Sequence, residues 1–144
     1  SDRVRILTLI KQMLEELSIQ IRFQALTVFE LINSLCENSQ LKELEFLKLV
    51  QGFLSTNINF NESWEKGITE WSNNVLHIED LNFLKNVGSN LGNSDIEGQL
   101  STIELHKENL ERLLASAIEN RDKKAKLYRS LGVLSGTFIS IMLL

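Results

Sequence analysis

The stretch that decides the fold is VRILTLIKQMLEELSIQIRF, residues 4–23. Its apolar side chains recur at spacings of three and four residues, which is the period of one face of an α-helix. The members of this apolar stripe are Val4, Leu7, Ile10, Leu14, Leu17 and Ile21. The stretch therefore predicts a long amphipathic first helix that ends near Ala25.

The same helical period continues along the chain, which has no proline to force a helix to stop. Thr27 followed by Glu30 has the pattern of a capping box, in which each residue's side chain binds the other's backbone N–H. Further helices are predicted over about 41–54, from about Asn59 onward with Glu62 in its first turn, and over about 78–91.

The last helix is predicted to begin with a second capping box, Ser94 and Glu97, with Asp95 in its first turn. Its apolar stripe consists of Ile96, Leu100, Ile103, Leu110, Leu114 and Ala117. The stripe fades after Ile118, although no helix breaker follows. A helix that loses its buried face in this way should leave the bundle.

The chain ends in KLYRSLGVLSGTFISIMLL, residues 126–144, which has no charged residue from Ser130 onward. As a helix, residues 130–144 would be about 22 Å long, against roughly 30 Å of bilayer hydrocarbon. We interpret 130–144 as a short or truncated transmembrane segment. Residues 1–129 would form a cytoplasmic helical bundle that ends in a basic juxtamembrane stalk, residues 119–129. The alternative is a C-terminal core helix of the same domain.

The fold predicted from these patterns is all-α. It is an antiparallel bundle of about six helices with long first and last helices, the last continuing toward the membrane. Trp64 and Trp71, seven residues apart, are interpreted as core anchors, and Cys36 as a buried small side chain. Arg3 and Arg5 would suit the cytoplasmic flank of an earlier membrane span.

Charge is distributed unevenly along the chain. Residues 1–120 carry 10 basic and 18 acidic side chains, a net charge of −8, which argues against a nucleic-acid partner. Five basic residues then form what we call the collar: Arg121, Lys123, Lys124, Lys126 and Arg129. They spread around the helix, which argues against a groove for a single anionic ligand and favours contact with lipid headgroups. The alternative is an ordinary solvated helix end.

Small residues are spaced four apart in the final segment, at Gly132, Gly136 and Ser140. On a helix they form one ridge, which is typical of membrane helices that pack closely together. Chance is the alternative, because glycine and serine are common in membrane helices.

Motifs of catalysis are missing from the sequence. It has no P-loop, no nucleophile elbow and no paired cysteines. His77 and His106 are isolated, and His77 with Glu79 and Asp80 is typical of a helix start rather than a metal site. We therefore expect no catalytic residue, no metal and no cofactor, and we predict that the protein is not an enzyme.

Two segments resemble the stage III sporulation protein AB family of spore-forming Firmicutes: the turn VGSNLGNSD, residues 87–95, and the ending, residues 126–144. In the ending, the residues that match the family pattern Y-[KR]-S-L-G-x-L-x-G are Tyr128, Ser130, Leu131, Gly132 and Gly136. In and after the turn, the matching residues are Gly88, Leu91, Gly92, Asp95 and Gln99. The sequence departs from the family at Leu26 and Thr27, where a Thr-Pro-like helix start is expected and the capping box replaces the proline.

The resemblance implies a role in endospore formation, since the family is similar to the F-type platform proteins of type II secretion and type IV pilus systems. It implies a non-enzymatic platform or adaptor in a channel complex that links mother cell and forespore. The implied partners are a cytoplasmic secretion-type ATPase, other membrane proteins of the channel, the membrane itself, and further copies of the chain. The implied location is the mother-cell membrane around the forespore, with the body facing the cytoplasm.

Two other classes of function stay open at this point. One is an unrelated membrane-anchored helical module that dimerises or signals through the ridge of Gly132 and Gly136. The other is an enzyme whose site the sequence does not reveal.

Overall fold

The computed structural model describes the backbone of residues 2–24, 26–71, 75–91 and 95–143, and the side chains of these ranges as far as Gly132. The described residues form helices and no strand, which confirms the all-α class with long first and last helices. In chain order the elements are α1 Asp2–Gln24, α2 Val28–Glu37, the 3-10 helix η1 Ser39–Leu41, α3 Phe46–Ser55, α4 Phe60–Trp71, α5 Ile78–Ser89 and α6 Ile96–Leu143.

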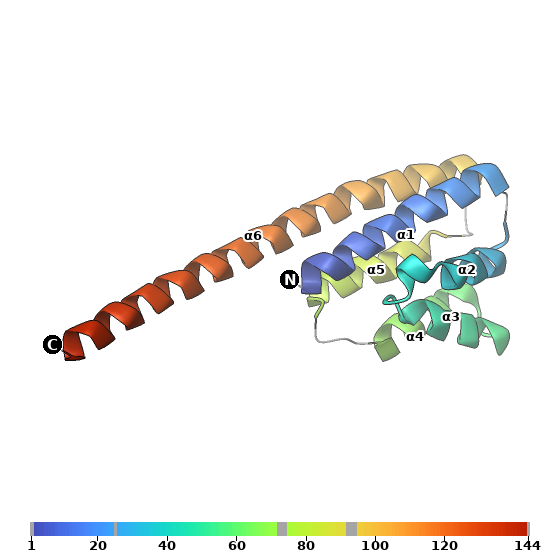
Figure 1. The fold of residues 1–144 in the computed structure, drawn as a ribbon. Helices are drawn as coiled ribbons and strands as arrows, with labels where there is room; N and C mark the ends of the chain where they lie inside the picture. The colour runs from blue at the N-terminus through green and yellow to red at the C-terminus, as the bar shows by residue number, and fades with distance from the viewer. Residues whose placement is uncertain (1, 25, 72–74, 92–94, 144) are drawn as a thin grey trace.

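The helices form two groups around one core. Helices α1 and α6 lie side by side and antiparallel, with α5 next to them, while α2, α3 and α4 form a second group (Figure 1). Helix α6 runs past the N-terminal end of α1 and continues alone, away from every other helix (Figure 1). The part of α6 that packs in the bundle and the part that protrudes from it therefore belong to one uninterrupted helix.

The predicted apolar stripe of α1 forms the centre of the core. Leu7, Ile10, Leu14 and Leu17 are fully buried. The stripe starts differently from the prediction, because Val4 is only half-buried and Arg3 is buried in its place. On the facing side of α6, the buried side chains end at Ala117.

The N-terminal end of the α6 stripe is less buried than predicted. Ile96 is 50% exposed and Leu100 is half-buried. Helix α6 begins at Ile96, so Asp95 is the capping residue and not part of the first turn: its Oδ1 accepts a hydrogen bond from the N–H of Gly98 at 2.9 Å. Ser94, the predicted cap, lies outside the described residues.

Side chains fix where two of the other helices start. Thr27 and Glu30 form the predicted capping box at α2, and Asn59 Oδ1 accepts from the N–H of Glu62 at 2.8 Å. The helix predicted over 41–54 is wrong at its start, because the Asn38 side chain accepts from the N–H of Gln40 at 3.0 Å. That contact favours the short η1, and α3 begins only at Phe46.

Trp64 holds the second group of helices to α5. It is 1% exposed, and its indole Nε1–H donates to the backbone oxygen of Leu84 at 2.8 Å. Phe46 packs edge-on against it, with 5.2 Å between ring centroids, and Trp71 packs on the same phenyl ring. Both tryptophans are therefore core anchors, as predicted. Gly88 lets the indole approach this closely, since a Cβ there would lie 2.2 Å from Trp64 Cδ1.

Two further side chains in or near the core can ionise. Cys36 is half-buried rather than fully buried, and burial raises the pKa of its thiol. His106 is 7% exposed and packs edge-on to Phe83, with 5.8 Å between ring centroids. Its Nε2 is buried without a hydrogen-bond partner in the described part of the chain, and burial lowers its pKa.

Replacing Gly88 by alanine should destabilise the protein by about 1–3 kcal/mol, because the added methyl group overlaps the Trp64 ring. The matched control is Gly52→Ala, since a Cβ at that position of α3 meets no atom within 4 Å. The control should stabilise the helix by up to about 1 kcal/mol. Urea unfolding measures both changes, and equal effects would contradict the close contact.

Acidification should destabilise the protein through His106. An imidazole in the unfolded chain has a pKa near 6.5, and the folded value is lower. The unfolded chain therefore takes up a proton first as the pH falls. The free energy of unfolding should decrease below about pH 6.5, down to the folded-state pKa. His106→Leu should show a smaller decrease over this range when both proteins are referenced to pH 8. An identical decrease in the two proteins would contradict this role.

Candidate functional site at the base of the stalk

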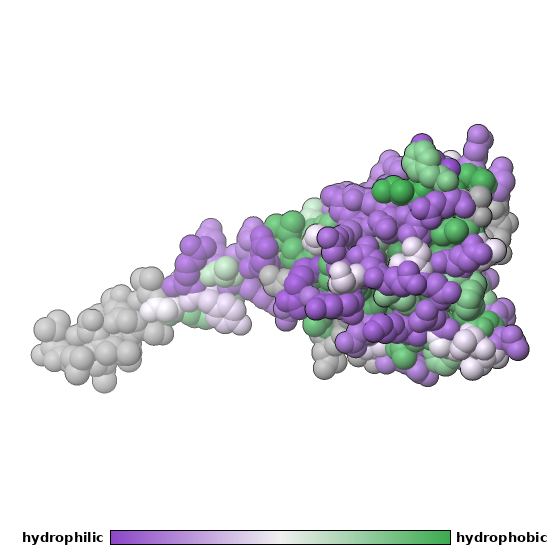
Figure 2. Space-filling view, turned by 45° about the vertical axis from the view of Figure 1, so that its right-hand side comes forward, coloured by the Kyte–Doolittle hydropathy of each residue, from purple (hydrophilic) through white to green (hydrophobic). Residues whose placement is uncertain are grey.

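The stalk is exposed on every side. All residues from 118 to 132 are exposed, which confirms that the buried face of α6 ends at Ala117. The five collar residues are among them. Lys123 pairs with Glu119 at 3.0 Å and Arg121 Nε with Asp122 at 3.4 Å, whereas the other three make no ion pair within the described ranges. Hydrophilic side chains cover much of this region where it leaves the bundle (Figure 2).

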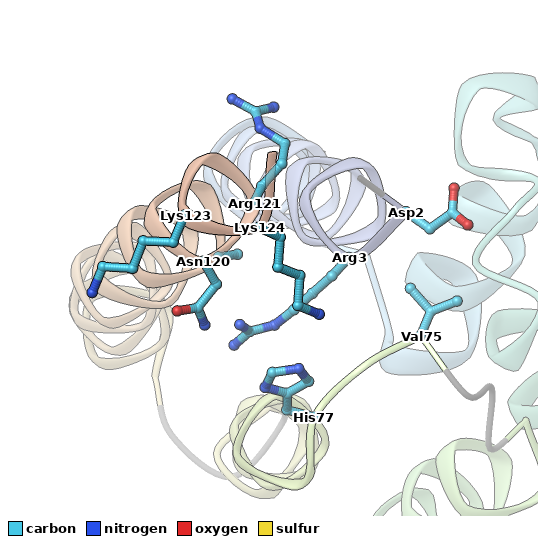
Figure 3. A pocket seen from close by; sticks show the side chains of 9 residues that line it. Asp2, Arg3, Val75, His77, Asn120, Arg121, Lys123 and Lys124 are labelled. Carbon is cyan, nitrogen blue, oxygen red and sulfur yellow. The ribbon is translucent and has the colours of Figure 1, made fainter. Parts of the chain in front are cut away.

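An open cleft of about 570 Å³ lies where the stalk leaves the bundle. The side chains around it come from the start of α1, the segment before α5, and α6 (Figure 3). They are Asp2, Arg3, Val75, His77, Ala117, Asn120, Arg121, Lys123 and Lys124. The cleft thus combines one wall from the bundle with one wall from the stalk.

The cleft brings three of the five collar residues together with residues of the bundle. Arg121, Lys123 and Lys124 all line it. Helix geometry explains part of this lining. Ala117, Asn120 and Lys124 follow the three- and four-residue spacing that places residues on one face of a helix. The pattern of α6 alone does not reveal the opposite wall, which comes from residues at least 40 positions away along the chain.

Arg3, on the bundle side of the cleft, forms a buried ion pair with Asp80. Its Nε donates to Asp80 Oδ2 at 2.8 Å and its Nη2 to Oδ1 at 2.9 Å, and Nη2 also reaches Glu79 at 3.2 Å. The exposed fractions are 8% for Arg3 and 0% for Asp80. The hydrogen bond to Asp80 is the main cause that raises the pKa of Arg3. The third nitrogen, Nη1, is buried and has no hydrogen-bond partner in the described ranges.

This pair gives Arg3 a structural role in the bundle that the sequence did not predict. A signal was present in the sequence, because Arg3 continues the buried stripe of Leu7 and Ile10 by one turn. The helix-start interpretation of His77 and Asp80 is correct, since the N–H of His77 donates to Asp80 Oδ2 at 2.9 Å. The same carboxylate therefore caps α5 and binds α1.

The residues of the family-pattern turn have structural roles wherever they are described. Gly88 contacts Trp64, Leu91 is buried in the core, and Asp95 caps α6. Gln99 is half-buried in the first turn of α6 and donates its backbone N–H to Asp95 O at 2.9 Å. Gly92 lies outside the described residues.

The predicted membrane segment is described only in part. Helix α6 continues to Leu143, but the side chains of residues 133–144, and with them Gly136 and Ser140, lie outside the described part. A Cβ built on Gly132 would meet no atom within 4 Å. In the part of the chain that the structure describes, no helix is both long enough and apolar enough to cross a membrane.

Metal-binding side chains do not gather in the described ranges. No group of three His, Cys, Asp or Glu residues there could hold a metal ion. His77 lines the cleft, and its Nδ1 lies 4.0 Å from Glu79 Oε1. The other polar residues that line the cleft offer charged groups and hydrogen-bond donors.

Arg3→Met should cost about 3–5 kcal/mol of stability, because it leaves the fully buried Asp80 carboxylate without its counter-charge. Adding Asp80→Asn should recover part of this loss by removing the stranded charge while keeping an acceptor for His77. Arg5→Met is the matched control. Arg5 pairs with Asp2 and Glu43, but it is 56% exposed, so the loss should stay below about 1 kcal/mol. Chemical unfolding of Arg3→Met, Asp80→Asn, the double variant and Arg5→Met measures these effects, and purely additive losses in the double variant would refute the pair.

Comparison with known proteins assigns the chain to a family. The family model of stage III sporulation protein AB matches residues 1–144, which is the whole chain. No curated protein and no solved structure matches the chain. The match covers the bundle, the cleft and the stalk alike, and the chain belongs to the stage III sporulation protein AB family.

Proposed function

We propose that this protein is a non-enzymatic platform of the sporulation channel complex that links mother cell and forespore. In this role the bundle binds the complex's secretion-type ATPase, and α6 connects it to the membrane components of the channel. The platform lies in the mother-cell membrane, and its body faces the cytoplasm. The family supports a function in stage III of sporulation.

The observation that carries the proposal is the continuity of α6. One helix of 48 residues packs in the bundle over its first part and is free of other helices beyond Ala117. No proline interrupts it. One helix thus packs in the core and also extends from it. A rigid helix of this kind can hold a partner bound to the bundle at a fixed distance from the membrane components of the channel.

The exposed collar supports a position next to a membrane. The bundle is acidic overall, whereas the collar concentrates five basic side chains within nine residues of α6. Basic residues beside an apolar segment favour the cytoplasmic leaflet, where anionic headgroups attract them. The family match favours this role over that of an unrelated dimerisation module.

A break in the stalk should separate binding from coupling. Inserting Gly-Pro-Gly after Lys126 interrupts the helix without touching the cleft or the core. We expect the tagged full chain still to co-purify with the ATPase from sporulating cells, while the yield of heat-resistant spores falls strongly. The control inserts four alanines at the same position, about one helical turn, and should keep most of the spore yield.

Each readout tests a different part of the proposal. If the ATPase fails to co-purify with the intact chain under conditions that retain the other channel proteins, coupling to the ATPase is wrong. If the break leaves spore yield at the level of the alanine control, the stalk is a flexible tether and not a rigid connector.

A further inference from the structure

We propose that the cleft at the base of the stalk binds a phosphate-bearing anion, held between Arg3 on the bundle and Lys124, Arg121 and Asn120 on α6. This inference goes beyond the platform role and does not depend on it, because it concerns only the residues that line the cleft.

Arg3 presents a donor that is fixed in place and unsatisfied. Asp80 and Glu79 hold its Nε and Nη2, so the planar guanidinium cannot rotate, and Nη1 points away from the Asp80 carboxylate. Nη1 is buried without a partner in the described residues. A buried donor without an acceptor costs free energy, and an anionic oxygen that reaches it would recover this cost.

Lys124 adds a positive charge that the described residues leave unbalanced. It lines the same cleft and makes no ion pair within the described ranges. In Figure 3 its side chain and that of Asn120 lie around the Arg3 guanidinium and above His77. Because Lys124 is exposed, it can shift to admit a ligand to Nη1.

The residues that line the cleft carry four basic side chains, Arg3, Arg121, Lys123 and Lys124, and one acidic side chain, Asp2. Lys123 is paired with Glu119, and Arg121 uses Nε toward Asp122, which leaves its two terminal nitrogens available. Asp2, the one acidic residue of the lining, is engaged by Arg5 at 3.0 Å. With their acidic partners these basic side chains carry no net charge, so the pull on an anion comes from the donors left free on Arg3, Arg121 and Lys124.

A phosphate group suits this donor set better than a carboxylate. The donors are two guanidinium groups, an ammonium and an amide, and they approach from two elements, so they need an acceptor with several oxygens in different directions. A phosphate monoester supplies three terminal oxygens and nearly two negative charges. The cleft, at about 570 Å³, is larger than a bare phosphate ion and has room for the group attached to it. Both a lipid headgroup and a small phosphorylated solute offer this chemistry.

The test uses the full chain in neutral detergent micelles and NMR of two reporters, the Arg3 Nε–H and the Asn120 side-chain amide. One arm adds inorganic phosphate, with chloride at equal ionic strength as reference. The other arm adds short-chain phosphatidic acid, with short-chain phosphatidylcholine as reference. The cleft variants are Lys124→Gln and Arg121→Gln. The matched controls, Lys126→Gln and Arg129→Gln, remove the same charges from the same helix outside the cleft.

We expect saturable shifts of both reporters and a loss of affinity of roughly tenfold for each cleft variant, against less than about twofold for each control. Such shifts with inorganic phosphate identify a soluble phosphate compound as a sufficient ligand. Shifts with phosphatidic acid alone identify a lipid headgroup. The absence of a saturable shift in both arms would overturn the proposal. Equal losses of affinity for cleft and control variants would overturn it too, because general charge attraction alone would then explain the binding.

Discussion

The buried ion pair between Arg3 and Asp80 is the constraint on which the arrangement of the helices depends. A carboxylate with no exposed surface is tolerable only when its oxygens are bound, and here Arg3 and the N–H of His77 bind both of them. The start of α1 is thereby tied to the start of α5. Helix α5 in turn carries Gly88 and Leu84, which receive Trp64 from the second group of helices. One ionic contact thus helps to orient both groups of helices in the bundle.

Much of the fold follows from local periodicity, whereas the site does not. The stripes of α1 and α6, the capping box at Thr27 and the end of burial near Ala117 all depend on residues close together in the chain, so the sequence predicts them. The partner of Arg3 lies 77 positions away, and no spacing rule connects the two. The cleft is a further step removed, because it exists only where separate elements meet. The predicted start of α3 was wrong for a local reason, because the Asn38 side chain caps the short helix η1 and α3 begins only after it.

The family match and the fold give different information about the same residues. The family places the chain in stage III of sporulation. The fold adds that the residues which match the family's turn pattern serve packing and capping wherever they are described, at Gly88, Leu91 and Asp95. Arg3, whose buried Nη1 has no partner among the described residues, and three collar residues lie instead where α6 leaves the bundle. Arg3 belongs to both sets, because it binds Asp80 inside the bundle and also lines the cleft.

Because α6 is uninterrupted, any tilt of the helix at the bundle would be amplified at its far end. From Ala117 to Leu143 the helix extends about 39 Å beyond its last buried residue, at 1.5 Å per residue. A tilt of about 10° at the bundle would displace the far end by about 7 Å, which exceeds the rise of a full helical turn. The cleft lies at the base of this extension, so a small change in the spacing of its two walls would be multiplied along the helix. The longest helix thus converts ångström-scale adjustments at its base into movements as large as a side chain at its tip.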